Sequence, residues 1–172
     1  MTSNELRLQI EAVSAGDRKA FERIYEELNK PMYTIILRIT NEQSLSEDIL
    51  QEVFVKLYQS PPTTARNPRA YLFQMARNLA IDGIRKRPQF ADLDDFEDLV
   101  YSPGIDVSDK LEVEEALKSL PLIDSQIVTL HVNGDLTFNE ISKILGIPIG
   151  TAIWRYHKAI KQLRLYLFGG AL

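Results

Sequence analysis

The 172-residue chain has no cysteine, a single tryptophan and only two histidines. Without cysteine it has no disulfide framework, no thiolate zinc site and no cysteine nucleophile, which fits a reducing compartment. His131 and His157 lie far apart in the sequence and have no ligand-type neighbours at metal spacing. We therefore expect no metal site and no required cofactor.

Long apolar runs are missing as well. No stretch approaches the roughly 20 apolar residues that a membrane span needs. The N-terminus lacks the basic segment and the apolar run that mark a signal peptide. These two absences predict a cytoplasmic protein without direct membrane insertion.

Patterns typical of enzymes and of β-structure are absent too. No glycine-rich phosphate loop, nucleophile elbow or pair of catalytic carboxylates stands out, so we predict that the chain is not an enzyme. Apolar residues recur instead at helical spacing through most of the sequence, with no strand-like alternation. This periodicity predicts an all-α fold.

Charge divides the chain into three parts. The formal net charge is −4, but residues 88–110 alone carry seven acidic and one basic side chain. The flanking parts are nearly balanced, with 13 basic and 11 acidic side chains in residues 1–87 and six of each in residues 111–172. We predict two small helical domains, an N-terminal helical bundle (1–87) and a C-terminal four-helix domain (111–172), joined by an acidic linker (88–110).

The most informative stretch lies in the C-terminal part and predicts a helix-turn-helix. Thr137 and Glu140 have capping-box spacing, and Gly146 stands where a left-handed C-cap residue is expected. After a short turn, a second helix begins near Thr151 and carries an apolar stripe. Its opposite face carries Thr151, Trp154, Arg155, Lys158 and Lys161. A second helix with such a face is typical of one that enters the major groove of DNA.

The alternative for this stretch is a helical hairpin with a solvated charged face. Charge asymmetry favours DNA binding, because the segment from Ile141 to the C-terminus contains no acid although the whole chain is acidic. Its five basic residues are Lys143, Arg155, Lys158, Lys161 and Arg164.

In the N-terminal part, local patterns predict helix boundaries. Asp17 is expected to cap a helix after a break at Gly16, and Pro31 is expected in the first turn of the next helix. Residues 44–47 (Ser-Leu-Ser-Glu) form another capping-box candidate. The helix that follows bears three polar residues on one side, Asp48, Gln51 and Glu52. The simplest explanation is that these residues near the start of the helix, two of them acidic, complement the helix dipole. The second explanation is that they form a contact patch for a partner.

The segment Arg66–Arg87 has six basic residues against one acid, with Tyr71 and Phe73 near its start. Cations interleaved with aromatics suit a single strand of nucleic acid, whose phosphates and unstacked bases they can contact. The alternative is a core helix whose last turn carries cations that match the dipole. That alternative explains Arg85–Arg87 better than it explains Arg66, Arg69 and Arg77.

Both halves resemble RNA polymerase sigma factors of the extracytoplasmic-function (ECF) group in the sigma-70 family. The resemblance covers roughly residues 16–87 and 113–167. In the first half it is carried by the D-x-x-Q-E-x-F run at 48–54 and by the A-R-N-x-x-x-D run at 76–82. In the second half it is carried by Leu120-Pro121, by Gly150-Thr151 and by residues 155–159.

The resemblance implies that the chain binds core RNA polymerase, through the β′ coiled coil and the β subunit, and binds promoter DNA. An anti-sigma factor is a further implied partner. Core-polymerase contacts would come from Asp48, Gln51, Glu52 and Phe54. Contacts to the −10 element, including a flipped base, would come from Arg66, Arg69, Tyr71, Arg77, Asn78 and Arg85. Contacts to the −35 element would come from Thr151, Trp154, Arg155 and Lys158.

The sequence departs from the family pattern at three positions. Ile153 and Trp154 replace the usual Lys and Ser, and Tyr71 stands where a Trp is common. Trp154 could pack on a thymine methyl or a sugar, or be covered by a partner in an inactive state. The competing functions are a stand-alone helix-turn-helix regulator that acts as a dimer, and a module that only occupies the polymerase.

Overall fold

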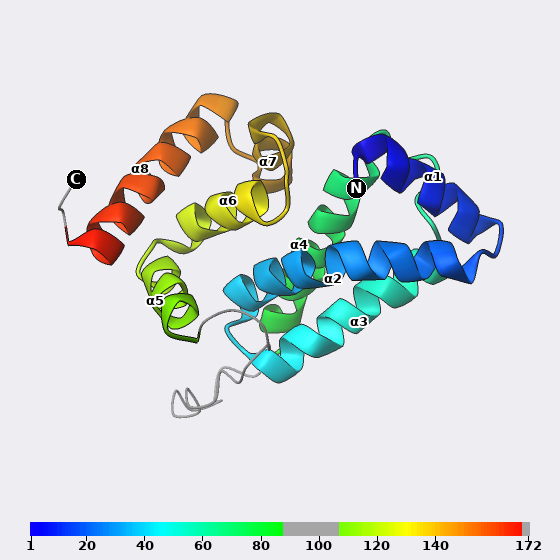
Figure 1. Cartoon of the computed structure of the whole chain (residues 1–172), viewed down its shortest axis with the longest axis horizontal. Coiled ribbons are helices and arrows are strands. Elements are labelled where there is room, and N and C mark those ends of the chain that lie inside the picture. Colours follow the sequence, from blue (N-terminus) through cyan, green and yellow to red (C-terminus); the bar gives the residue numbers. More distant parts are fainter. Residues whose placement is uncertain (88–106, 170–172) are drawn as a thin grey trace.

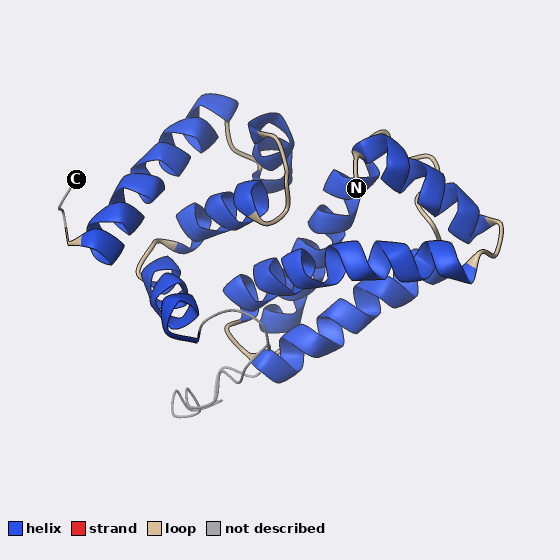
Figure 2. Cartoon of the chain, viewed as in Figure 1, coloured by secondary structure: helices blue, strands red, loops and turns tan. Residues whose placement is uncertain are grey.

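The computed structural model describes residues 1–87 and 107–169, and within these ranges the chain forms eight α-helices and no strand (Figures 1 and 2). The all-α prediction is confirmed. The N-terminal unit consists of α1 (Ser3–Ser14), α2 (Arg18–Thr40), α3 (Gln43–Gln59) and α4 (Pro68–Arg85). The C-terminal unit consists of α5 (Val107–Lys118), α6 (Leu122–Val132), α7 (Phe138–Leu145) and α8 (Ile149–Phe168).

Helix α2 is the central element of the N-terminal unit, and it packs against α1, α3 and α4. The Asp17 side chain caps it by accepting from the backbone N–H groups of Lys19 and Ala20, as predicted. Its apolar stripe is fully buried in the core of the unit. That stripe comprises Ala20, Ile24, Leu28, Met32, Ile35 and Ile36.

Two predicted helix starts in this unit are wrong. Pro31 lies inside α2 rather than at the start of a new helix. A proline inside a helix removes one backbone hydrogen bond, but the buried stripe continues past Pro31 and its packing outweighs that loss. The Ser44–Glu47 capping box does not form either, because α3 already begins at Gln43. Ser46 is buried inside the helix, where its hydroxyl donates to the Glu42 carbonyl at 2.6 Å.

The C-terminal unit contains the predicted helix-turn-helix, formed by α7 and α8. The Thr137 hydroxyl accepts from the Glu140 N–H at 3.3 Å, and the Glu140 carboxylate accepts from the Thr137 N–H at 2.8 Å. Gly146 ends α7 with φ of 66°, a left-handed conformation that costs glycine no Cβ clash. The capping box and the C-cap are therefore confirmed.

The acidic linker falls almost entirely on residues 88–106, which lie outside the described ranges. Its last four predicted residues are helical, because α5 begins at Val107.

The two units pack against each other and share a buried core. Helix α6 packs against both α2 and α8, and α7 packs against α4, so α6 and α7 lie between α8 and the N-terminal unit (Figure 1). Every residue of α6 from Asp124 to Leu130 is buried, which is expected of a helix with neighbours on several sides. Five apolar side chains from α6, α7 and the loop between them belong to the same core cluster as the N-terminal unit. They are Ile127, Leu130, Leu136, Ile141 and Ile144.

Candidate protein and nucleic-acid interfaces

An open groove of about 780 Å³ lies between α2 and α3, and we call it the α2–α3 groove. Its walls are aromatic, with Phe21 and Tyr58 centroids 5.3 Å apart and Tyr25 and Phe54 centroids 4.7 Å apart. Tyr25 and Tyr58 remain about half exposed, as does Val55. Polar side chains surround these walls, namely Arg18, Glu22, Gln51 and Gln59. An exposed aromatic groove with a polar rim has the composition of a protein-binding surface.

The four residues predicted to contact the polymerase all lie on α3, in or near this groove. Gln51 and Phe54 line it, while Asp48 and Glu52 are exposed on the same helix. Phe54 is only 4% exposed, so it shapes the wall of the groove rather than projecting from it. Glu52 forms an exposed ion pair with Lys56 at 3.4 Å, and such pairs contribute little to stability.

Three aromatic residues of the groove, Phe21, Tyr25 and Tyr58, are not among the predicted site residues. Their helical spacing is that of apolar stripes, which by itself indicates a core position. Their aromatic character was the available clue, because aromatic residues are enriched at interfaces. The packing of α2 against α3 sets which aromatic residues of the two helices face each other across the groove.

Helix α4 carries five of the six residues predicted to contact the −10 element, and Arg66 lies in the loop before it. Asn67 caps this helix by accepting from the Ala70 N–H at 3.1 Å, and Pro68 occupies its first turn. Four of the six predicted residues are exposed and belong to this helix or to the loop before it. They are Arg66, Tyr71, Asn78 and Arg85.

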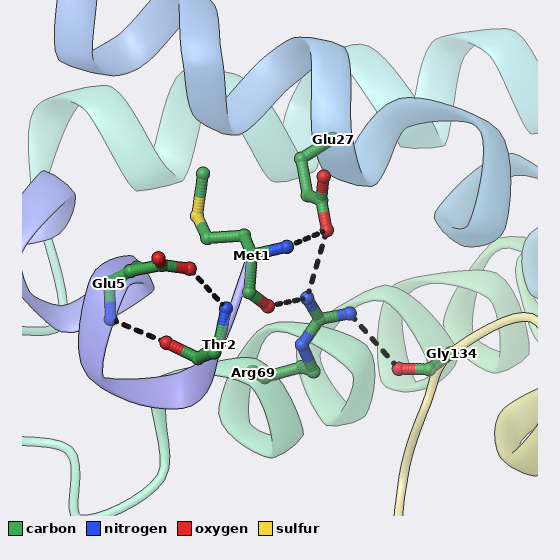
Figure 3. Close-up of polar contacts among 6 residues, drawn as sticks. All are labelled: Met1, Thr2, Glu5, Glu27, Arg69 and Gly134. Atoms are coloured by element: carbon green, nitrogen blue, oxygen red, sulfur yellow. Dashed lines mark hydrogen bonds and ion pairs between the residues drawn. The ribbon is translucent and has the colours of Figure 1, made fainter.

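Arg69 does not fit the prediction of a DNA contact in this arrangement, because it is 6% exposed. Its guanidinium donates to the Gly134 carbonyl at 3.2 Å, to the Met1 carbonyl at 2.9 Å and to the Glu27 carboxylate at 3.3 Å (Figure 3). Glu27 also binds the Met1 ammonium at 2.9 Å, which is the main reason that the pKa of Glu27 lies below its usual value. Arg69 therefore joins α4 to α2 and to the loop that precedes α7.

Arg77 is also engaged by the C-terminal unit. Its Nε–H donates to the Gln126 side chain of α6 at 2.9 Å, and burial lowers the pKa of its guanidinium. At the start of α4, the Asn67 amide donates to Glu140 at the start of α7. The C-terminal unit thus covers Arg69 and Arg77 but leaves the other four predicted residues accessible.

The predicted −35 residues lie on α8, the second helix of the helix-turn-helix. Trp154 is 60% exposed, and the Lys158 ammonium lies 5.2 Å from its ring centroid. Thr151 is partly buried near the start of the helix. Arg155 instead turns toward α6, where it donates to the Asp124 carboxylate at 2.7 Å.

Asp124 is a residue whose role the sequence did not reveal. Its side chain is completely buried, and the ion pair with Arg155 links it to α8. A buried carboxylate requires such a partner because an unpaired charge in the interior is costly. The pair sets α8 against α6, so Arg155 supports the helix rather than facing outward with Trp154.

Comparisons with known proteins agree with this geometry on both units. The family described as Sigma-70 region 2 matches residues 24–89, and the family described as Sigma-70, region 4 matches residues 110–163. The chain belongs to the sigma-70 family. Helices α2–α4 make up most of its region 2, and α5–α8 make up its region 4.

Relatives of similar length extend the sigma-70 match over nearly the whole chain. The ECF RNA polymerase sigma factor SigW of Bacillus subtilis is 29% identical over 181 residues, covering 94% of this chain and 96% of SigW. The ECF RNA polymerase sigma factor SigK of Mycobacterium ulcerans is 26% identical over 174 residues, covering 94% of this chain and 93% of SigK. These relatives place the chain in the ECF group.

Two solved structures share the fold of this sigma-70 chain. The sigma factor RpoE of Bartonella quintana, in complex with the anti-sigma factor NepR, matches with a TM-score of 0.70 and 21% identity. That match covers 87% of this chain and 97% of the other. CnrH, in complex with the cytosolic domain of CnrY, matches with a TM-score of 0.65 and 16% identity, covering 97% and 99% of the two chains.

Metal-binding clusters and membrane-spanning helices are both absent from the described residues. Residues 1–87 and 107–169 contain no group of three or more His, Asp or Glu side chains that could hold a metal ion. Over the same ranges, none of the helices combines the length and the apolar character needed to cross a membrane.

Proposed function

We propose that this chain is a cytoplasmic ECF sigma factor that binds core RNA polymerase and directs it to a subset of promoters. The observation that carries the proposal is the presence in one chain of a region 2 unit and a region 4 unit that ends in a helix-turn-helix. This role needs no catalytic centre or cofactor in the chain itself. The enzyme is the polymerase, and this chain supplies the promoter specificity.

The α2–α3 groove is the surface that we assign to the polymerase. Its aromatic walls offer apolar area to a partner, while the exposed Asp48, Gln51 and Glu52 offer polar contacts beside it. The β′ coiled coil of core polymerase is the partner proposed for this groove. The C-terminal unit does not contribute to the lining of the groove, so polymerase could approach it in the arrangement seen here.

Promoter binding, in contrast, requires the two units to separate. Arg69 and Arg77 can contact the −10 element only after they release Gly134 and Gln126 of the C-terminal unit. We propose that docking on polymerase selects the open arrangement, because it is the one in which both units can contact promoter DNA. Since phosphates are contacted by both units, promoter affinity should fall steeply with salt.

An anti-sigma factor is the third partner in this proposal. The Bartonella quintana structure with NepR shows that a chain of this fold can be held by such a protein. A partner that binds the closed arrangement better than the open one would keep Arg69 and Arg77 covered.

The proposal is tested by a pull-down of core RNA polymerase with the full-length chain. We compare the wild type with Asp48→Ala/Gln51→Ala/Glu52→Ala and, as a matched control, with Glu112→Ala/Glu115→Ala, which removes two exposed acids of α5. The wild type and the control should retain polymerase at moderate salt, and the triple variant should lose it. Failure of the wild type to bind would overturn the proposal.

The competing function, a stand-alone dimeric regulator, predicts a different set of results. It requires a dimer in solution and duplex binding without polymerase. Sedimentation of the free chain separates the two, because a sigma factor is expected to be a monomer. A stable dimer that does not bind polymerase would establish the regulator instead.

A further inference from the structure

The recognition helix α8 begins with apolar rather than basic side chains. Its first residues, 149–154, read Ile-Gly-Thr-Ala-Ile-Trp, and Thr151 is the only residue among them with a hydroxyl or charged side chain. In a helix-turn-helix, the N-terminal residues of the second helix contact the edges of the bases. This helix therefore has no Arg or Lys in its first turns for the bidentate contact with guanine.

Trp154 is the largest side chain in this part of the helix and lies on its outer face. It is 60% exposed, whereas Ala152 and Ala159 on the opposite face are completely buried. Lys158 is positioned over the indole at 5.2 Å, a cation–π contact that restrains the orientation of the ring. Ile153, the residue before Trp154, is also exposed, at 37%. Adjacent exposed apolar side chains of this kind mark a surface that another molecule covers.

The charge around this surface favours nucleic acid as that molecule. The segment from residue 141 onward carries five cations and no acid. Arg155 is the cation next to Trp154 in sequence, but Asp124 holds it at 2.7 Å, away from the outer face. The surface is thus an apolar side chain with Lys158 and Lys161 beside it on the same exposed side of α8, which suits the apolar part of a base edge next to phosphates.

We infer that Trp154 determines promoter specificity by packing its indole against the 5-methyl group of a thymine in the −35 element. The inference rests on the proposed function. The thymine methyl is the apolar group that a base pair presents in the major groove, and the first turns of α8 supply apolar partners for it. Burial of one methyl group is worth about a fourfold change in affinity.

The test uses holoenzyme assembled from the full-length chain and core polymerase. Duplexes that it binds are first selected from a random-sequence pool. In a selected duplex, each thymine of the upstream element is then replaced singly by deoxyuridine, which lacks only the 5-methyl group, and the dissociation constant is measured. At one or more positions the wild type should bind the deoxyuridine duplex about fourfold more weakly.

Two variants show whether Trp154 is the residue that senses the methyl group. Trp154→Ala should bind the thymine and deoxyuridine duplexes equally. Lys161→Ala, the matched control on the same exposed side of α8, should weaken both duplexes but keep the fourfold ratio. Since both side chains are exposed, thermal unfolding of the two variants should match that of the wild type.

Each other outcome has a defined meaning. A wild type that is insensitive to every replacement would overturn the inference, as would a Trp154→Ala variant that keeps the wild-type ratio. The second result is expected if a protein partner, rather than DNA, covers Trp154. If the chain binds core polymerase but the holoenzyme selects no sequence from the random pool, the proposal that the chain recognises promoters is overturned. This inference is then overturned as well.

Discussion

Replacement of Arg69 by alanine should destabilise the chain by about 2–4 kcal/mol. Arg69 is 6% exposed and donates three hydrogen bonds, to Gly134, Met1 and Glu27. Removal of the guanidinium leaves the carbonyl of the buried Gly134 without this partner, which costs about 1–3 kcal/mol. Loss of the contact to Glu27 adds less to the destabilisation, because the Glu27 side chain is 36% exposed and is still paired with the Met1 ammonium.

The measurement is urea unfolding of the full-length chain followed by circular dichroism. Arg66→Ala is the matched control, since Arg66 is exposed and lies three positions earlier, and its free energy of unfolding should change by less than about 0.5 kcal/mol. Equal stability of the two variants would refute the view that Arg69 is a structural cation.

A second measurement separates local stability from the contact between the units. Because the chain has no cysteine, labels can be placed uniquely at exposed positions of α3 and α8 with Glu47→Cys and Gln162→Cys. If about 2 kcal/mol is lost from the closed arrangement alone, the ratio of closed to open molecules falls roughly 30-fold. Energy transfer between the labels should then decrease in Arg69→Ala. Unchanged transfer would show that Arg69 does not hold the units together.

Three further predictions concern the helix cap, the buried ion pair and pH. Thr137→Ala should lower the free energy of unfolding by about 1 kcal/mol in urea titration, because the capping box of α7 is lost. Arg155→Ala should cost about 3 kcal/mol in the same assay by leaving the fully buried Asp124 carboxylate unpaired, and an unchanged stability would show that the pair is not structural. The pKa of Glu27 is lowered in the fold, so its contribution is present above the unfolded value of 4.5 and is lost as pH falls through the lower folded value. Stability profiles below about pH 5 should therefore be flatter for Glu27→Gln than for the wild type.

Helix content and the helix-turn-helix could be predicted from the sequence because their determinants are local. The capping box of Thr137 and Glu140 and the C-cap of Gly146 each involve residues within one or two turns. Apolar stripes likewise report which face of a helix is buried. Local rules failed at Pro31 and Ser46, where burial of a continuous stripe and a hydroxyl bonded inside the helix overrode the expected boundaries.

Accessibility of the candidate binding residues depends on contacts between residues that are distant in the sequence. Arg69 and Gly134 lie 65 positions apart, Arg77 and Gln126 lie 49 apart, and Arg155 and Asp124 lie 31 apart. No periodicity or cap links residues over such distances. From the sequence, Arg69, Arg77 and Arg155 therefore look like the exposed cations Arg66 and Arg85, and all five are predicted to contact DNA.

The same division holds for the surfaces proposed to bind polymerase and promoter DNA. Residue type and spacing predict an acidic and aromatic helix in the first half of the chain and a basic second helix of the helix-turn-helix at its end. Only packing decided that Phe21, Tyr25 and Tyr58 line a groove with Phe54, and that Trp154 stays exposed while Arg155 turns inward. Residue type sets what a side chain can bind, whereas its neighbours in the folded chain set whether that side chain is accessible to a partner.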